Sequence, residues 1–458
     1  MKRSLIVAVL IAAVIGSCRR PEPAPEAPAA SALPFIVEPL GAPAQGNSGQ
    51  PQLTTSDRGV ILSWLEQTDA AATLKFSELA GGGWTAAKTV ASSEGWFVTD
   101  ADVPTVMRKR DGTLVATTYP SVDPAIEAYD VRLSYSRDDG STWSPPFSPH
   151  HDGTKSQHGF ASLFEMPEGA LGMVWLDGRV QQAMSVYFAS FDAEWKQTAE
   201  SSVNARVCEC CPTSATMTAD GPLVAFRDRT NQEIRDIHVT RIERPSTSLG
   251  AGGKWTEAVP VHADNWRIEA CPVNGPALSA RGRMVAAAWF TATGNDGHAY
   301  AAFSRDAGRT WGDPIRLDDQ TSLGRIDIEL LEDGSAIATW VEFASERAQL
   351  RVRQVRPSGE RSTATTIAGA GERRVRGYPR AGSDLDVPLH DREGSDVHVR
   401  IDKGFAVDDR RVVNHRRDIS RTTASISSSS STRFEALAFS KIARTRASSR
   451  DLPCDASQ

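Results

Sequence analysis

Ser-Arg-Asp-Asp-Gly-Ser-Thr-Trp, at residues 136–143, returns as Ser-Arg-Asp-Ala-Gly-Arg-Thr-Trp at residues 304–311. Each copy follows an apolar run and carries a glycine at its fifth position, which permits a positive φ. The aspartate two residues before that glycine can accept hydrogen bonds from the amides of a turn. The closing tryptophan offers a large ring for burial. Both copies are therefore predicted to be strand–turn–strand corners. They begin 168 residues apart, which is three times 56.

A second phrase recurs between residues 48 and about 356: a glycine-containing turn, then an apolar strand that usually ends near an aromatic residue. Its six copies begin at Gly59, Gly112, Gly169, Gly221, Gly282 and Gly334. Their aligned strand ends, at residues 64, 117, 175, 226, 289 and 340, are 51 to 63 residues apart. Further short strands flank each copy, and four strands per unit at this period are typical of a β-propeller. Two β-sandwiches would not explain the common phase of the six phrases.

The predicted fold is therefore all-β, a propeller over residues 48–371 with six recognisable four-stranded blades and room for an incomplete seventh. The motif S-x-D-x-G-x-T-W resembles the Asp-box, or bacterial neuraminidase repeat, of the sialidases. The phrase Met-Val-Trp-Leu-Asp-Gly-Arg at residues 173–179 also resembles a sialidase second strand. In that family the Asp-boxes lie on outer turns, away from the active site. The resemblance thus implies a structural role for Ser136, Asp138, Gly140, Trp143, Ser304, Asp306, Gly308 and Trp311.

The N-terminus is typical of an exported chain. Basic residues 1–3 precede an apolar run, Leu5 to Ile15, that is too short to span a bilayer. The run ends in Ile-Gly-Ser-Cys, which resembles a bacterial lipobox, so residues 1–18 are predicted to be a lipoprotein signal peptide with lipidation at Cys18. An ordinary secretory signal is the alternative. Residues 19–47 are rich in proline and alanine and are predicted to be a tether. We expect a protein anchored at the bacterial cell envelope, on the outer membrane or the periplasmic face, where disulfides can form.

The C-terminal stretch, residues 372–458, has a different composition from the repeats. It contains 15 arginines and a serine tract, and none of the 11 tryptophans lies beyond Trp340. A seventh unit begins at Gly377-Tyr378-Pro379-Arg380 and does not continue. Low hydrophobicity with many charges favours disorder. The alternative is a shift of the reading frame near Arg380, which would leave the ring without part of a seventh unit or without its closing strands.

The repeat register predicts which residues share one face of the propeller. The start of each first strand and the end of each second strand lie together, because they are antiparallel neighbours. At matching positions, the six second-strand ends carry Glu66, Tyr119, Asp177, Asp228, Thr291 and Glu342. Arg179, Arg227 and Arg229 lie beside these residues, and the planar guanidinium group suits a carboxylate ligand. Paired carboxylates suit glycoside chemistry, in which one acts as general acid.

Candidate roles follow from this face. The candidate catalytic residues are Asp228, Asp177, Tyr119 and Glu66. The candidate substrate-binding residues are Arg227, Arg229, Arg179, Arg325 and Glu342. The resemblance to sialidases implies three arginines on a sugar carboxylate, an aspartate acid/base and a Tyr–Glu nucleophile pair, for which Tyr119 and Glu66 are the candidates. The alternative for Asp177 and Asp228 is an ion-pair network with the neighbouring arginines.

One departure from the family and one dense charge cluster bear on these roles. The family's first-strand motif, aromatic-Arg-Ile-Pro, is replaced by Gln-Pro-Gln-Leu at residues 50–53, which contains no arginine. Residues 227–236 are the densest charge cluster of the repeats, predicted to be either a solvated loop or part of a ligand site.

Two functions of different classes remain open. One is a sialidase-like exo-glycosidase acting on anionic, sialic-acid-type glycans, and the other is a propeller that binds glycans or proteins without turnover. The net charge of −6 gives no nucleic-acid footprint. We expect an anionic small ligand, no cofactor and a monomer.

Four cysteines raise a third possibility. Cys208, Cys210 and Cys211 precede the fourth unit, and Cys271 precedes the fifth. Disulfides are expected in an exported protein, and a Cys211–Cys271 bridge across two blades is one of the three pairings that four cysteines permit. The alternative is a thiolate metal site assisted by His158 or His262, although the spacing is not that of a standard zinc ribbon. The main hypotheses include no metal.

Overall fold

The computed structural model describes residues 40–44, 47–99, 101–180, 183–243 and 254–369, together with strands 385–390 and 396–401. Within these ranges the regular elements are β-strands and two short 3₁₀ turns, Pro167–Gly169 and Thr293–Asn295. Apart from two separate two-stranded pairs, the strands form six antiparallel sheets in a six-bladed β-propeller, which confirms the predicted fold class. No helix of the described ranges has the length and apolarity needed to cross a membrane.

Each blade takes its strands from one continuous stretch of chain. Blade 1 contains β1 (Ser48–Ser56), β2 (Gly59–Gln67), β3 (Ala72–Ala80), β4 (Gly83–Trp84) and β5 (Lys88–Ser93). Blade 2 contains β6 (Val106–Arg108), β7 (Leu114–Thr118) and β10 (Arg132–Ser136), and β8 (Ser121–Asp123) pairs separately with β9 (Ala128–Tyr129). Blade 3 contains β11 (His158–Glu165), β12 (Leu171–Asp177), β13 (Ser185–Phe191) and β14 (Gln197–Asn204).

The second half of the ring repeats this arrangement. Blade 4 contains β15 (Ser214–Thr218), β16 (Gly221–Arg227), β17 (Ile237–Glu243), β18 (Lys254–Trp255) and β19 (Val259–Pro260). Blade 5 contains β20 (Ala277–Arg281), β21 (Met284–Thr291), β22 (His298–Ser304) and β23 (Ile315–Arg316). Blade 6 contains β24 (Thr321–Leu330), β25 (Ala336–Ala344), β26 (Arg347–Val355) and β27 (Thr365–Gly369). Blade 2 differs from the others because its fourth strand is reduced to a single bridge between Leu133 and Phe147.

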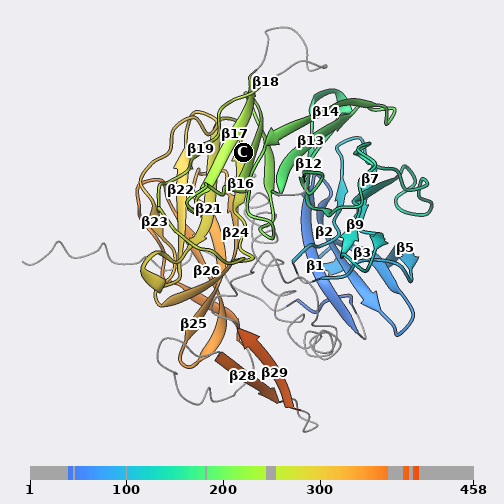
Figure 1. Ribbon diagram of the computed structural model, residues 1–458. Helices are drawn as coiled ribbons and strands as arrows, with labels where there is room; N and C mark the ends of the chain where they lie inside the picture. The colour runs from blue at the N-terminus through green and yellow to red at the C-terminus, as the bar shows by residue number, and fades with distance from the viewer. Residues whose placement is uncertain are drawn as a thin grey trace, which may run out of the picture.

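The blades follow one another around the molecule in chain order, from the blue sheet of blade 1 to the orange sheet of blade 6 (Figure 1). First strands of neighbouring blades contact each other, for example β11 with β15 and β15 with β20, so they line the axis. The start of β11 pairs with the end of β12 through His158 and Asp177. This register confirms that first-strand starts and second-strand ends share one face, which we call the mouth face.

Five apolar cores lie between successive blades. The second-strand tryptophans Trp175, Trp289 and Trp340 each lie in a core shared with the preceding blade. Burial of one large apolar side chain contributes about 1.5–3 kcal/mol, so these cores fix each blade to its neighbour. Trp64 of blade 1 and Ile337 of blade 6 lie instead in two separate clusters, and no core of the described ranges joins blade 6 to blade 1. We call the region between these two blades the seam.

The two octapeptides form the same hydrogen-bonded turn. Ser136 Oγ donates to Asp138 Oδ1 and accepts from the Gly140 amide, while Thr142 donates to Asp138 through both its amide and its hydroxyl. The copy at residues 304–310 repeats these bonds. Gly140 has a φ of 81°, and a Cβ there would lie 2.6 Å from the ring of Phe76 in blade 1. The predicted turn is thus confirmed, and its glycine lets it pack closely on the preceding blade.

Several predictions lie wholly or partly outside the described residues. The signal peptide 1–18, with Cys18, lies entirely outside them. The tether 19–47 is described only at residues 40–44 and at 47. Within the C-terminal stretch, β28 (Leu385–His390) and β29 (Asp396–Ile401) pair as an antiparallel hairpin. The rest of residues 372–458 lies outside the description, so the disorder and frame-shift alternatives stay predictions.

Candidate functional site

Three of the predicted mouth-face acids are held by a tryptophan of their own strand. The indole N–H of Trp175 donates to Asp177 over 2.8 Å, and that of Trp340 donates to Glu342 over 2.9 Å. Trp64 makes the same bond to Glu66 over 3.0 Å. In each case the tryptophan precedes the acid by two residues, which places both side chains on the same side of the strand. We call this arrangement the indole clasp.

These three acids have further structural partners. Asp177 is fully buried and accepts two hydrogen bonds from the Arg179 guanidinium, at 2.9 and 2.8 Å. Glu66 pairs with Lys75 at 2.6 Å, and Glu342 accepts the Asp319 amide at 3.0 Å. The contacts of Asp177 therefore agree with the alternative prediction, an ion pair with a neighbouring arginine. The indole clasps explain why acids recur at this position of the strand.

Asp228 occupies the same position in blade 4, but its strand carries Phe226 in place of tryptophan, so it has no indole clasp. Its carboxyl is half-buried. Burial raises the pKa of Asp228, and the nearby charge of His238 offsets this rise only in part. A half-buried acid with a raised pKa has the character of a general acid. Of the second-strand acids, Asp228 alone keeps that character.

Beyond Asp228, three arginines converge on one carboxylate. Glu233 accepts hydrogen bonds from Arg229 Nε at 2.9 and 3.0 Å, from Arg235 Nη2 at 2.9 Å and from Arg206 Nη2 at 3.2 Å. Glu209 pairs with Arg229 and, at 3.1 Å, with Arg235. We call these five residues the blade-4 arginine cluster. Its three guanidiniums against two carboxylates give the cluster one net positive charge, which the neighbouring Asp228 offsets only when it is ionised.

Glu233 reaches this cluster from a tight turn. Its φ is 59°, in the left-handed region that few non-glycine residues adopt. The Glu233 amide donates to the carbonyl of Thr230, which closes the turn. The Nε–H groups of Arg206 and Arg235 are buried and donate no hydrogen bond, so the two glutamates do not use all the donors. Contacts with Arg229 and Arg235 hold the pKa of Glu233 below its usual value, although burial acts in the opposite direction.

The structure places the other predicted arginines in structural roles. Arg227 is buried and donates to the backbone carbonyls of Asn274, Arg235 and Phe290, which ties blade 4 to blade 5. Burial lowers the pKa of Arg227 to about 9. Arg179 pairs with Asp177 and Glu200 and stacks on the Tyr187 ring at 3.8 Å.

Arg325 has a φ of 55° in β24, and its amide donates to Asn274 Oδ1. This contact places Arg325 beside blade 5, separate from the contacts that build the blade-4 arginine cluster.

Tyr119 and Glu66 have different partners in the structure. Tyr119 is buried and lies against Asp102 and Tyr129, whereas Glu66 bonds to Lys75 and Trp64. The expected Tyr–Glu pair is therefore not assembled here. Burial raises the pKa of Asp102 to about 7, which the Phe160 amide and the hydroxyls of Tyr119 and Tyr129 offset only in part. Asp102 is 2 % exposed, which keeps it out of reach of a ligand on the surface.

The four cysteines form disulfides, as expected, but not in the pairing that joins Cys211 to Cys271. The bonds are Cys208–Cys211 and Cys210–Cys271. A turn at residues 209–210 brings Cys211 back to Cys208, and Cys210 then faces Cys271 of the segment leading into blade 5. A Cys210–Cys271 bond therefore links the two blades in place of Cys211–Cys271. All four sulfurs that a thiolate metal site would need are thus paired.

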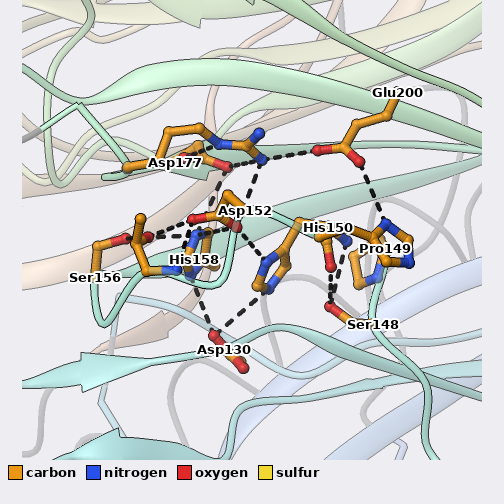
Figure 2. A network of polar contacts seen from close by, with 12 residues as sticks. Asp130, Ser148, Pro149, His150, Asp152, Ser156, His158, Asp177 and Glu200 are labelled. Carbon is orange, nitrogen blue, oxygen red and sulfur yellow. Dashed lines mark hydrogen bonds and ion pairs between the residues drawn. The ribbon is translucent and has the colours of Figure 1, made fainter.

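The sequence interpretation missed Arg206, Asp130, His150 and Asp152, and it named His158 and His262 only as helpers of a thiolate metal site. Arg206 lies in the blade 3–blade 4 connection and had no repeat signal. In the connection between blades 4 and 5, His262 bonds to Asp264 at 2.7 Å beside a cavity of about 240 Å³ that Thr291 and Tyr300 also line. Asp130, His150, Asp152 and His158 gather beside Asp177 (Figure 2). Asp130, His150 and Asp152 lie in connections, where the repeat register does not reach, whereas His158 opens β11.

Comparison with known proteins places the chain among structures of low similarity. No protein-family model matches the sequence, and the curated proteins contain no match. Among solved structures, a polysaccharide lyase is 15 % identical to this chain, with a TM-score of 0.44. The match covers 78 % of this chain and 87 % of the lyase.

Two further solved structures have similar values. The arabinofuranosidase of Fusarium graminearum with an iminosugar inhibitor is 10 % identical, with a TM-score of 0.41. The match covers 71 % of this chain and 94 % of the arabinofuranosidase. The Aleuria aurantia lectin with α-methyl-L-fucoside is 10 % identical, with a TM-score of 0.39. The match covers 72 % of this chain and 96 % of the lectin. At these values no activity transfers to this chain, so its function is derived below from its own residues.

Proposed function

We propose that the protein binds an anionic glycan on the mouth face, through a carboxylate of the sugar held by the blade-4 arginine cluster. The observation that carries this proposal is the convergence of Arg206, Arg229 and Arg235 on the single carboxylate of Glu233. Guanidinium forks match a carboxylate in shape and charge. Glu233 thus occupies the position that we assign to the carboxylate of the ligand.

The cluster has the charge and the accessibility that a binding site requires. Arg229 and Glu233 keep 21 % and 18 % of their side-chain surface exposed, so solvent reaches them, whereas Arg235 behind them is 3 % exposed. The net positive charge of these five residues favours an anion. A ligand carboxylate would take over the arginine donors while Glu233 turns outward on its loop.

The direct test is binding of three oligosaccharides: sialyllactose, a uronic-acid disaccharide and neutral lactose. We expect the folded full chain to prefer an anionic ligand and Arg229→Ala to weaken that binding at least about tenfold, the loss of one charge-assisted pair. Arg283→Ala is the matched control, because Arg283 pairs with Asp220 outside the cluster and is exposed. Equal binding of lactose, or full binding by Arg229→Ala, would contradict the proposal.

A second variant should strengthen binding. Glu233→Gln keeps the shape of the internal side chain but removes the charge that competes with the ligand. We expect tighter binding of the anionic oligosaccharide and no change for lactose. A gain of this kind cannot come from misfolding, so an unchanged or weaker affinity would argue against the displacement of Glu233.

Asp228 favours a second candidate function, a sialidase-type exo-glycosidase. Its raised pKa and missing indole clasp suit a general acid next to the arginines. This candidate predicts release of a fluorophore from a sialoside, with loss of release in Asp228→Asn and retained glycan binding. Absence of turnover between pH 4 and pH 8 by a folded chain that binds the glycan would leave the binding function alone.

We also propose, from the N-terminal sequence, that the chain acts as a monomer anchored through lipid on Cys18 at the cell envelope. Labelling with a fatty-acid analogue should mark the wild type and not Cys18→Ala. A soluble, unlabelled wild type would overturn the anchor.

A further inference from the structure

We propose that Asp130, His150 and His158 form a binding site for one divalent transition-metal cation of the zinc type. Figure 2 shows these side chains pointing toward one another between blades 2 and 3. Asp130 follows β9, His150 lies in the loop between β10 and β11, and His158 opens β11. Three separate parts of the fold thus deliver one carboxylate and two imidazoles to one point.

The first observation is a pair of imidazole nitrogens without partners. His150 Nε2 and His158 Nδ1 are buried and make no hydrogen bond. They lie 3.5 and 3.2 Å from the same oxygen, Asp130 Oδ1, but without the alignment of a hydrogen bond. The two rings are stacked, with centroids 3.8 Å apart, so one ring must rotate out of the stack for both nitrogens to reach one ion. His150 is 7 % exposed and His158 is 0 % exposed, so water does not serve these nitrogens freely.

The opposite nitrogens explain which way the protons point. His150 Nδ1 bonds to Asp152 Oδ1 at 2.7 Å. His158 Nε2 lies 3.4 Å from the same oxygen and forms a hydrogen bond with Ser156 Oγ at 3.4 Å. A carboxylate on one ring nitrogen holds the proton there and leaves the lone pair on the other nitrogen. Both lone pairs would then face the anionic Asp130 Oδ1. Such an arrangement is repulsive unless an added proton or a metal cation lies between them, and the metal alternative matches the carboxylate–histidine–metal pattern of zinc proteins.

The distances between the candidate ligand atoms also fit. For metal–ligand bonds of 2.0–2.2 Å, the edge of a tetrahedron between two ligands is roughly 3.3–3.6 Å. The two nitrogen–oxygen distances given above are close to this edge. The other oxygen of Asp130 is held by Arg132 Nη2 at 2.6 Å, which leaves Oδ1 for the cation.

The surrounding charge favours a cation as well. Four carboxylates, those of Asp130, Asp152, Asp177 and Glu200, face two arginines, Arg132 and Arg179. Two negative charges therefore remain around the two imidazoles. Two imidazoles and one carboxylate suit zinc and its neighbours in the transition series better than magnesium or calcium, which prefer oxygen ligands alone. A fourth coordination position is left for water.

The experiment measures metal binding by the full chain after chelator treatment and removal of the chelator. We expect one equivalent of Zn²⁺ per chain by elemental analysis and a rise in Tm when Zn²⁺ is added. Asp130→Asn and His150→Gln should lose both responses. Asp152→Asn should keep the stoichiometry and lose about 10–100-fold in affinity, because it removes the carboxylate that orients both rings. His262→Gln is the matched control, since His262 also pairs with an aspartate, outside the cluster.

The cysteines provide the competing explanation, and Co²⁺ separates the two. A site of imidazoles and carboxylate gives weak visible bands, whereas thiolates add strong charge-transfer absorption in the near ultraviolet. Charge-transfer absorption, metal retained by Asp130→Asn, or a folded wild type that binds neither Zn²⁺ nor Co²⁺ would each overturn the proposal. Because the wild-type measurements alone can overturn it, a variant that fails to fold does not leave the proposal untested.

Discussion

Asp177 of blade 3 and Asp228 of blade 4 occupy the same register position on the same face, yet their surroundings are opposite. Asp177 accepts the Trp175 indole and the Arg179 guanidinium and is fully buried. Asp228 follows Phe226, has no indole clasp and stays half-buried with a raised pKa. Two neighbours account for the difference: Trp175 and Arg179 both bind Asp177, whereas Phe226 offers Asp228 no donor and Arg229 pairs with Glu233 instead.

The largest expected effect is that of Asp177→Asn. An amide has one accepting oxygen in place of two and carries no charge, so it cannot accept all the bonds from the Trp175 indole and from Arg179, and the guanidinium loses its buried counter-charge. We expect a loss of about 3–5 kcal/mol in the free energy of unfolding, as for breaking a buried ion pair. Asp228→Asn should change that free energy little or raise it slightly. Urea unfolding of the two variants measures the difference, and equal losses would mean that the comparison is wrong.

Asp102 extends the comparison to a buried acid without a cation. Its pKa in the folded chain, about 7, lies above the ordinary value of 3.8. Ionisation is thus disfavoured by folding, and the cost is absent below about pH 4, grows up to about pH 7 and then stays constant. Asp102→Asn should raise the free energy of unfolding at pH 8 by up to about 4 kcal/mol. Unfolding at pH 4 and pH 8 tests this, and the gain should vanish at pH 4.

Trp175→Phe makes blade 3 resemble blade 4. Asp177 loses its indole donor while the apolar contacts of the ring are largely kept. We expect a loss of about 1–3 kcal/mol, the cost of leaving a buried acceptor with one partner fewer. Trp340→Phe should behave alike, because Glu342 makes the same clasp. If neither variant differs from the wild type in chemical unfolding, the indole clasp contributes nothing.

The smallest expected effect is that of Asp306→Asn. Asp306 lies in the turn of the second octapeptide, and its pKa is lowered, whereas that of Asp102 is raised. Hydrogen bonds from Thr310 and Ser304 outweigh burial and lower it to about 2. A lowered pKa means that the contribution to stability is complete above the ordinary value of 3.8 and is lost as the pH falls toward 2. Asp306→Asn should therefore show a shallower loss of stability between pH 4 and pH 2 than the wild type. Parallel acid-unfolding curves would contradict this.

Most of what could be predicted from the sequence followed from its internal repeat. The glycine turns at Gly140 and Gly308 recur with a fixed phase, and that phase gave the blade order and the residues of the mouth face. It could not show that Glu66, Asp177 and Glu342 are clasped, because the clasp depends on a hydrogen bond within the strand. It also could not place Arg206 or His150, since both lie in connections of irregular length. Loop residues follow no periodicity, so their convergence becomes visible only in three dimensions.

The seam has a consequence for how the chain opens. Blades 2 to 5 each share a core with both neighbours, whereas blades 1 and 6 share one core each within the described ranges. In an array of repeats, the units with one neighbour open first. Amide hydrogens of β2 and β25 should exchange with solvent before those of β12 and β16. Blades 3 and 4, which carry both clusters of the mouth face, then form the slowest-exchanging part of the ring.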